Sequence, residues 1–209
     1  MTTQDLNEKQ IQILLIAEKL FAEKGFDGTS IRDISKEAQI NIAMVSYYFG
    51  SKEKMLEALI YFRTSDLKMQ LESLSKEAIS PKEKINKLIE LYIDRIDKNK
   101  CIYQILHFEL SSKKRTIDLK SFTEVKKQNL EFLKQIIEEG QEKRMFRKDI
   151  NIILLPSTIL GPFFHFQMNR SLYGEMLGLT TDEVYDQFVK TDLTKHIQQT
   201  IQSLLLDEK

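Results

Sequence analysis

The chain is poor in residues that interrupt helices and in cysteine. It has 7 glycines, 3 prolines and a single cysteine among 209 residues. Few stretches alternate apolar and polar residues, so helices are favoured over strands, and one cysteine excludes an internal disulfide. The first ten residues lack the basic-then-apolar pattern of a secretory signal. We therefore expect an all-α protein in the reducing cytoplasm.

Patterns typical of catalysis or metal binding are also missing. The three histidines are scattered and form no H-x-x-x-H or H-E-x-x-H spacing. The chain has no glycine-rich phosphate loop and no G-x-S-x-G turn. A lone thiol such as Cys101 is more often a small buried residue than a redox sensor. We expect no enzyme activity, no metal and no cofactor.

Net charge is zero, because 31 basic residues balance 31 acidic ones. Residues 1–52 contain six basic and seven acidic side chains, so that segment is not basic either. Binding of nucleic acid would then depend on a local positive face, helix N-termini and hydroxyl groups. Weak non-specific binding with a modest salt dependence is the expected consequence.

The N-terminal 50 residues nevertheless have the layout of a DNA-reading helix-turn-helix. An apolar stripe predicts a helix over residues 5–24 that Gly25 ends. Ser30, with Asp33 three residues later, predicts the start of a short second helix. Asn41 can cap a third helix, in which Val45 and the next-turn Phe49 face inward. The outer side is left with Ile42, Ala43, Met44, Ser46 and Tyr47.

This segment resembles the N-terminal domain of the TetR family of bacterial transcriptional regulators. The resemblance rests on Ala17, Leu20, Phe21, Gly25, Thr29, Ser30, Ile34, Ala38, Tyr48, Phe49 and Lys52. It departs from the family at Ser46, where a tyrosine is common, and at Tyr48, where a histidine is. The DNA-binding residues expected from the motif are Thr29, Ser30, Arg32, Asn41, Ala43, Met44, Ser46, Tyr47, Tyr48 and Lys52.

Each DNA-binding assignment has a plainer alternative. A surface arginine such as Arg32 is usually only a solvated charge. Tyr47 and Tyr48 could both be core aromatics, although adjacent residues point to different sides of a helix, so at least one should be exposed. Met44 can pack against a thymine methyl, and the short Ala43 lets the helix approach the bases. Lys52 opens a helix, where a lysine disfavours the dipole, so a phosphate partner would account for it.

Beyond the motif the sequence predicts further helices. Their expected ranges are 52–76, 81–97, 101–110, 116–144, 151–169 and 182–206, with a loop over 173–181. Residues 151–169 carry no charge, but they are too polar and too broken for a membrane span. Gly161 and Pro162 should kink or divide that helix. We expect residues 1–51 to form the DNA-binding domain and residues 52–209 a helical effector-binding and dimerisation domain.

The uncharged helix and the amphipathic last helix fit two arrangements. They could form a four-helix seam between two subunits, or they could fold into the core of a single chain. The resemblance favours the seam, because TetR-type regulators pair through their last two helices. The candidate seam residues are Phe164, Met168, Leu193, Ile197, Ile201 and Leu204.

The resemblance also implies a small-molecule effector in the helical body. Aromatic residues suggest an apolar pocket with a few polar anchors, although the same side chains could be plain core. The candidate ligand-binding residues are Tyr92, Tyr103, His107, Phe122, Asn129, Phe163 and Gln167. The implied protein is a homodimeric repressor of a palindromic operator, in which the effector moves the fourth helix and the two reading heads. Alternatives are a constitutive regulator or activator without a ligand, and an all-helical enzyme or interaction module.

Overall fold

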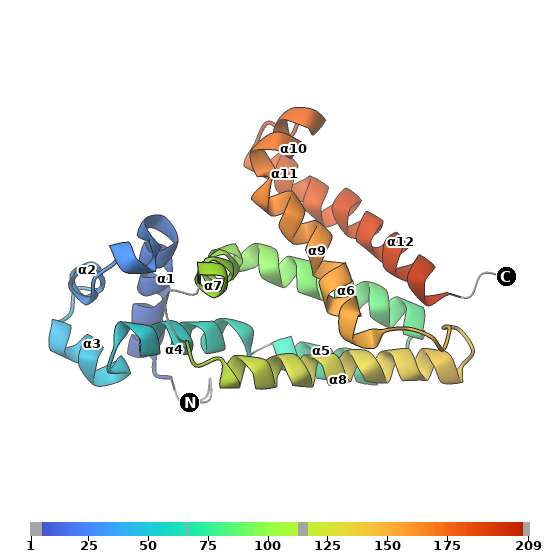
Figure 1. Cartoon of the computed structure of the whole chain (residues 1–209), viewed down its shortest axis with the longest axis horizontal. Coiled ribbons are helices and arrows are strands. Elements are labelled where there is room, and N and C mark those ends of the chain that lie inside the picture. The colour runs from blue at the N-terminus through green and yellow to red at the C-terminus, as the bar shows by residue number, and fades with distance from the viewer. Residues whose placement is uncertain (1–5, 66, 113–116, 207–209) are drawn as a thin grey trace. The chain divides into compact units, whose positions relative to one another are not determined.

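The computed structural model describes residues 6–65, 67–112 and 117–206, and all regular structure in these ranges is helical. The expected all-α class is confirmed. The chain divides into two compact units (Figure 1). Unit 1 comprises residues 1–67 and 99–126, and unit 2 comprises residues 68–98 and 127–209. The units follow contacts rather than sequence order, so the domain boundary after residue 51 stays a prediction.

Unit 1 contains the N-terminal helices and a later segment of the chain, residues 99–126. Its helices are α1 (Glu8–Gly28), α2 (Ile31–Glu37), α3 (Ile42–Phe49), α4 (Lys52–Thr64), α7 (Lys100–Ser112) and the start of α8 (Lys120–Glu142). Helix α1 packs against α2, α4 and α7. Their shared core includes Ile13, Phe21, Ile34 and Leu56, all of which are buried. This core fixes the positions of α2 and α3.

Side-chain caps set the helix starts in unit 1. Asn7 accepts from the backbone N–H of Gln10, whose side chain accepts from the N–H of Asn7, so α1 starts at Glu8. The expected start at Asp5 lies outside the described residues. Gly25 has φ 75° and breaks the helical path within α1, as expected from the sequence.

Unit 2 is built around α6. Its helices are most of α5 (Leu67–Lys76), α6 (Pro81–Lys98), the rest of α8, α9 (Leu155–Met168), α10 (Arg170–Leu177), α11 (Asp182–Phe188) and α12 (Thr194–Leu205). A π-helical segment, Val189–Leu193, joins α11 to α12. Both α9 and α12 pack against α6 and against each other.

Several expected helix boundaries were wrong. The single helix expected over 52–76 is two helices, because α4 ends at Thr64, Ser65 is not helical, and α5 begins at Leu67. Helix α8 begins at Lys120, not at Thr116, which lies outside the described residues. The loop expected over 173–181 includes most of α10. Helix α9 continues through Pro162 and is not divided there.

The end of α8 depends on a close contact at Gly140. A Cβ at this position would lie 2.0 Å from the ring of Phe146, which is buried. Arg144 follows with φ 54°, a left-handed conformation that glycine adopts more easily.

Within the residues that the structure describes, no helix combines the length and the apolar character needed to cross a bilayer.

Candidate DNA-binding site

Local hydrogen bonds set the start of α2 and, after the turn that joins the two helices, the start of α3. Ser30 accepts from the N–H of Asp33 at 3.1 Å, and the Asp33 carboxylate accepts from the N–H of Ser30 at 2.9 Å. The Ser30 hydroxyl, which donates to the Asp33 carboxylate at 2.5 Å, and the Ser30 N–H lower the pKa of Asp33 below its ordinary value. Gln39 takes φ 53° in the turn, and Asn41 then caps α3 by accepting from the N–H of Ala43 at 2.8 Å.

Helix α3 has one buried side and one exposed side. Val45 and Phe49 are buried and hold α3 on the core of unit 1. The exposed side carries Ile42, Ala43, Met44, Ser46 and Tyr47. The Tyr47 side chain is 84% exposed, and its ring meets that of the half-buried Tyr48 edge-on at 5.4 Å. An exposed apolar and aromatic helix face, anchored from behind, suits contact with base edges in a major groove.

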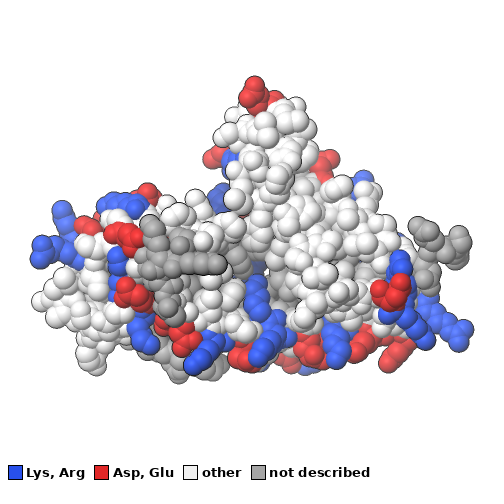
Figure 2. Space-filling model, in the orientation of Figure 1, with Lys and Arg blue, Asp and Glu red and all other residues white. Residues whose placement is uncertain are grey.

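Positive charge gathers beside this face and not on it. Figure 2 shows Lys and Arg side chains over α2 and an uncharged surface over α3. Arg32 and Lys36 on α2 are exposed. No hydrogen bond or ion pair engages the Arg32 guanidinium within the described part of the chain. Arg32 is therefore available to a phosphate or a base, as the sequence led us to expect.

Three of the expected contact residues already make structural hydrogen bonds. Thr29 is 1% exposed, and its hydroxyl donates to the carbonyls of Leu20 and Gly25 at 3.0 and 2.9 Å. Its buried side chain holds the end of α1 and is not exposed for a contact with DNA. Ser30 and Asn41 are exposed, but their side chains already serve as helix caps. Either side chain could contact a phosphate only if it also kept its capping hydrogen bond.

The ammonium group of Lys52 lies inside the motif. It donates to the carbonyls of Phe26 and Thr29, both at 2.8 Å, and sits 4.2 Å from the centroid of the Phe26 ring. These contacts tie the first turn of α4 to the end of α1. They account for a lysine at a helix start without any phosphate, contrary to the sequence argument. Sequence reasoning missed this role because the partners lie 23 and 26 residues away.

The expected effector residues are divided between the two units. Tyr103, His107 and Phe122 belong to unit 1, where His107 is exposed and the other two are half-buried. The four in unit 2 are Tyr92, Asn129, Phe163 and Gln167. Of these, Gln167 is half-buried and donates to Asp97 at 3.2 Å, and the others are buried.

Three of the expected seam residues point into unit 2. Leu193, Ile197 and Ile201 are buried in the single chain, where α12 packs on α6 and α9. Their apolar stripe is therefore covered without a second subunit. Met168 and Leu204 are 69% and 44% exposed, and Phe164 is half-buried. Only these last three offer apolar surface to a partner.

Among residues 6–65, 67–112 and 117–206, no group of three or more His, Cys, Asp or Glu side chains is placed to hold a metal ion. Cys101 is half-buried on α7.

Comparison with known proteins identifies both parts of the chain. Residues 13–59 match the family described as "Bacterial regulatory proteins, tetR family", and residues 81–201 match "Tetracyclin repressor-like, C-terminal domain". The second match alone covers more than half of the chain. The HTH-type transcriptional repressor NicS of Pseudomonas putida is 28% identical over 90% of this chain and 88% of its own length.

Two solved structures share the fold. One is the regulator FadR from Bacillus subtilis in complex with stearoyl-CoA, with a TM-score of 0.70 and 20% identity over 93% of this chain and 98% of FadR. The other is the ketosteroid transcriptional regulator KstR2 of Mycobacterium tuberculosis, with a TM-score of 0.62 and 19% identity over 98% of each chain. With a helix-turn-helix whose α3 face is exposed and with both family matches, the chain belongs to the TetR family and is a DNA-binding transcriptional regulator, not an enzyme.

Proposed function

We propose that the protein is a homodimeric repressor that binds a palindromic operator in the bacterial cytoplasm and leaves it when a small, largely apolar effector molecule binds. The observation that carries the DNA-binding part is the α3 face, where Tyr47 is 84% exposed while Val45 and Phe49 anchor the helix. A helix held in this way can enter a major groove while its buried side stays packed on the core. Two such heads read half-sites about 34–36 Å apart, one turn of DNA.

Support for the dimer comes from the uncharged surface of unit 2. Residues 151–169 include α9 and carry no charged side chain, yet one side of α9 is exposed. The face of the molecule in Figure 2 is mostly uncharged over α9 to α12. Met168 on α9 and Leu204 on α12 are exposed. A second copy that covers this surface would bury apolar area without desolvating charges, as homodimer interfaces usually do.

Met168→Glu should convert the dimer to a monomer and reduce operator binding. At a two-fold seam the change places two carboxylates near each other and away from water, which is costly. The matched control is Met69→Glu, because Met69 on α5 is 70% exposed and Met168 is 69% exposed. Analytical ultracentrifugation should show monomer for the first variant and dimer for the second. If both variants stay dimeric, the seam lies elsewhere.

Support for an effector site in unit 2 comes from a buried polar atom. Asn129 on α8 is 3% exposed, and its side-chain oxygen has no hydrogen-bond partner in the described part of the chain. Leaving a buried acceptor unpaired costs about 1–3 kcal/mol. A ligand hydroxyl or amide would pair it, and buried aromatic residues such as Tyr92 and Phe163 are typical of an apolar binding site.

Asn129→Leu should stabilise the free protein and weaken its response to effector. Leucine has the same number of side-chain heavy atoms in a similar branched shape and removes the unpaired acceptor, so the free energy of unfolding should rise by about 1 kcal/mol. The effector would lose its hydrogen-bond partner, so its thermal shift should shrink. Differential scanning calorimetry with and without effector measures both quantities. A lower stability in the free variant would mean that the Asn129 side chain is already paired in the protein.

The operator and effector can be tested together. Selection of genomic fragments on the purified protein should yield one palindromic sequence, and fluorescence anisotropy should show its release by effector. Stearoyl-CoA is the first candidate, because the FadR structure with this fold holds it, and a ketosteroid is the second. Free coenzyme A is the control for the headgroup alone. Specific operator binding that no effector changes would favour a constitutive regulator. The absence of any preferred fragment would reject the repressor.

A further inference from the structure

We propose that unit 1 has a small-molecule site of its own, beside the recognition helix α3. It would take a neutral molecule with an aromatic or aliphatic body and one hydroxyl or carbonyl group. This site is separate from the effector site proposed in unit 2. It would act on operator binding without any change in the C-terminal helices.

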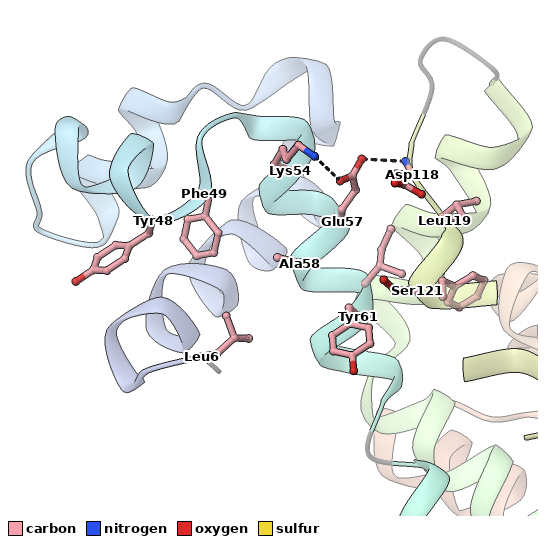
Figure 3. A pocket seen from close by; sticks show the side chains of 12 residues that line it. Leu6, Tyr48, Phe49, Lys54, Glu57, Ala58, Tyr61, Asp118, Leu119 and Ser121 are labelled. Atoms are coloured by element: carbon pink, nitrogen blue, oxygen red, sulfur yellow. Dashed lines mark hydrogen bonds and ion pairs between the residues drawn. The ribbon is translucent and has the colours of Figure 1, made fainter. Parts of the chain in front are cut away.

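The site is a cavity of about 300 Å³ within unit 1. Ligand pockets begin at about this volume. The end of α3, one side of α4 and the start of α8 form its walls, and Leu6 closes it on the side of α1 (Figure 3). The apolar part of the lining is Leu6, Phe49, Ala58, Ile60, Leu119 and Phe122. An apolar ligand body fits such a surface.

Three charged side chains, Lys54, Glu57 and Asp118, lie in the lining and are linked by local contacts. Glu57 on α4 lies 3.8 Å from the ammonium group of Lys54 and accepts from the N–H of Asp118 at 2.9 Å. Asp118 in turn accepts from the N–H of Lys120 at 3.0 Å. The two contacts of Glu57 appear as dashed lines in Figure 3. The lining thus carries one positive and two negative side chains, which disfavours an anionic ligand, and its larger apolar part favours a neutral one.

Two hydroxyl groups in the lining remain available. Neither Tyr61 on α4 nor Ser121 on α8 forms a hydrogen bond through its hydroxyl within the described residues. Both side chains reach water at present, since Tyr61 is half-buried and Ser121 is exposed. A ligand that displaces this water would need one polar group to replace its hydrogen bonds. The proposed ligand therefore carries one hydroxyl or carbonyl group.

A ligand in the cavity would contact residues of the recognition helix directly. Tyr48 and Phe49 line the cavity and are the last two residues of α3. Tyr48 also contacts Tyr47 edge-on. A ligand that shifts either ring changes the position of the recognition helix relative to α4. By linkage, such a ligand must alter operator affinity by the same factor by which the operator alters ligand affinity.

The test uses the full chain with 2-naphthol as the probe, since it joins an apolar body to one hydroxyl. Two-dimensional NMR should show saturable shifts confined to the lining residues. Ala58→Phe fills the cavity from α4, and Ser121→Phe fills it from α8. Thr123→Phe is the control, because Thr123 is exposed on α8 and does not line the cavity. Both filling variants should bind the probe at least tenfold more weakly, and the control should bind it like the wild type.

The binding measurement uses no DNA, so its outcome does not depend on whether the repressor proposal is right. If Ala58→Phe does not fold, the exposed position of Ser121 still permits the test. Shifts that map to unit 2, or that persist in both filling variants, would overturn the site. Where binding is found, operator anisotropy with and without 2-naphthol should show a changed affinity in the wild type and in Thr123→Phe. An unchanged operator affinity would reject the coupling to α3.

Discussion

Replacing Tyr47 with alanine should weaken operator binding about tenfold to a hundredfold and leave the melting temperature unchanged. Removal of one base contact costs about 1–3 kcal/mol. Stability should not change, because the side chain is 84% exposed and its ring meets Tyr48 only edge-on. Sequence preference should also relax, because we expect Tyr47 to touch a base and not the backbone. Anisotropy on the operator and on a scrambled duplex measures both effects.

Two further variants make this result specific. Phe108→Ala removes another exposed aromatic from unit 1, 55% exposed on α7, and should leave operator binding unchanged. Arg32→Ala should also weaken binding, with a smaller salt dependence if the guanidinium meets a phosphate. An equal weakening by Tyr47→Ala and Phe108→Ala would show that the α3 face does not read DNA.

The DNA-binding face could be predicted because the signals that build it are local. Ser30 with Asp33 and the single cap Asn41 each act within three residues, and they fixed the starts of α2 and α3 correctly. The period of 3.6 residues then placed Val45 inward and Tyr47 outward. The break at Gly25 was equally local. The family resemblance added the function that these helices carry.

Other residues make contacts that no local pattern contains. Lys52 and Thr29 have the chemistry of phosphate ligands, but distant backbone carbonyls in the fold use their donors. The stripe of Ile197 and Ile201 looks the same whether it meets a partner subunit or α6 of its own chain. Burial in the single chain shows which surface covers it. The cavity beside α3 is likewise lined by segments about 60 residues apart in the sequence, such as those that contain Glu57 and Asp118.

Lys52→Met should therefore destabilise unit 1 and leave the salt dependence of operator binding almost unchanged. The variant keeps much of the apolar stem but removes the ammonium group that donates to the carbonyls of Phe26 and Thr29 and lies over the Phe26 ring. Hydrogen bonds from charged groups contribute about 1.5–3 kcal/mol each. In the variant, water can bond to the two carbonyls that lose the ammonium group, which reduces the combined loss of stability. We expect the free energy of unfolding to fall by about 2–3 kcal/mol, which is about 5–10 °C in melting temperature.

The neighbouring Lys54 supplies the matched control. Its side chain is 69% exposed, and its ion pair with Glu57 is long, at 3.8 Å, so Lys54→Met should change stability by less than about 0.5 kcal/mol. Thermal melts followed by circular dichroism compare the two variants. Anisotropy over a range of salt concentrations, well below the melting temperature, then separates the two roles of Lys52. Removal of a phosphate ligand would weaken binding to all sequences alike and lower the salt slope by about 1. If Lys52→Met has the melting temperature of the wild type but a smaller salt slope, this lysine binds DNA and does not hold α1 to α4.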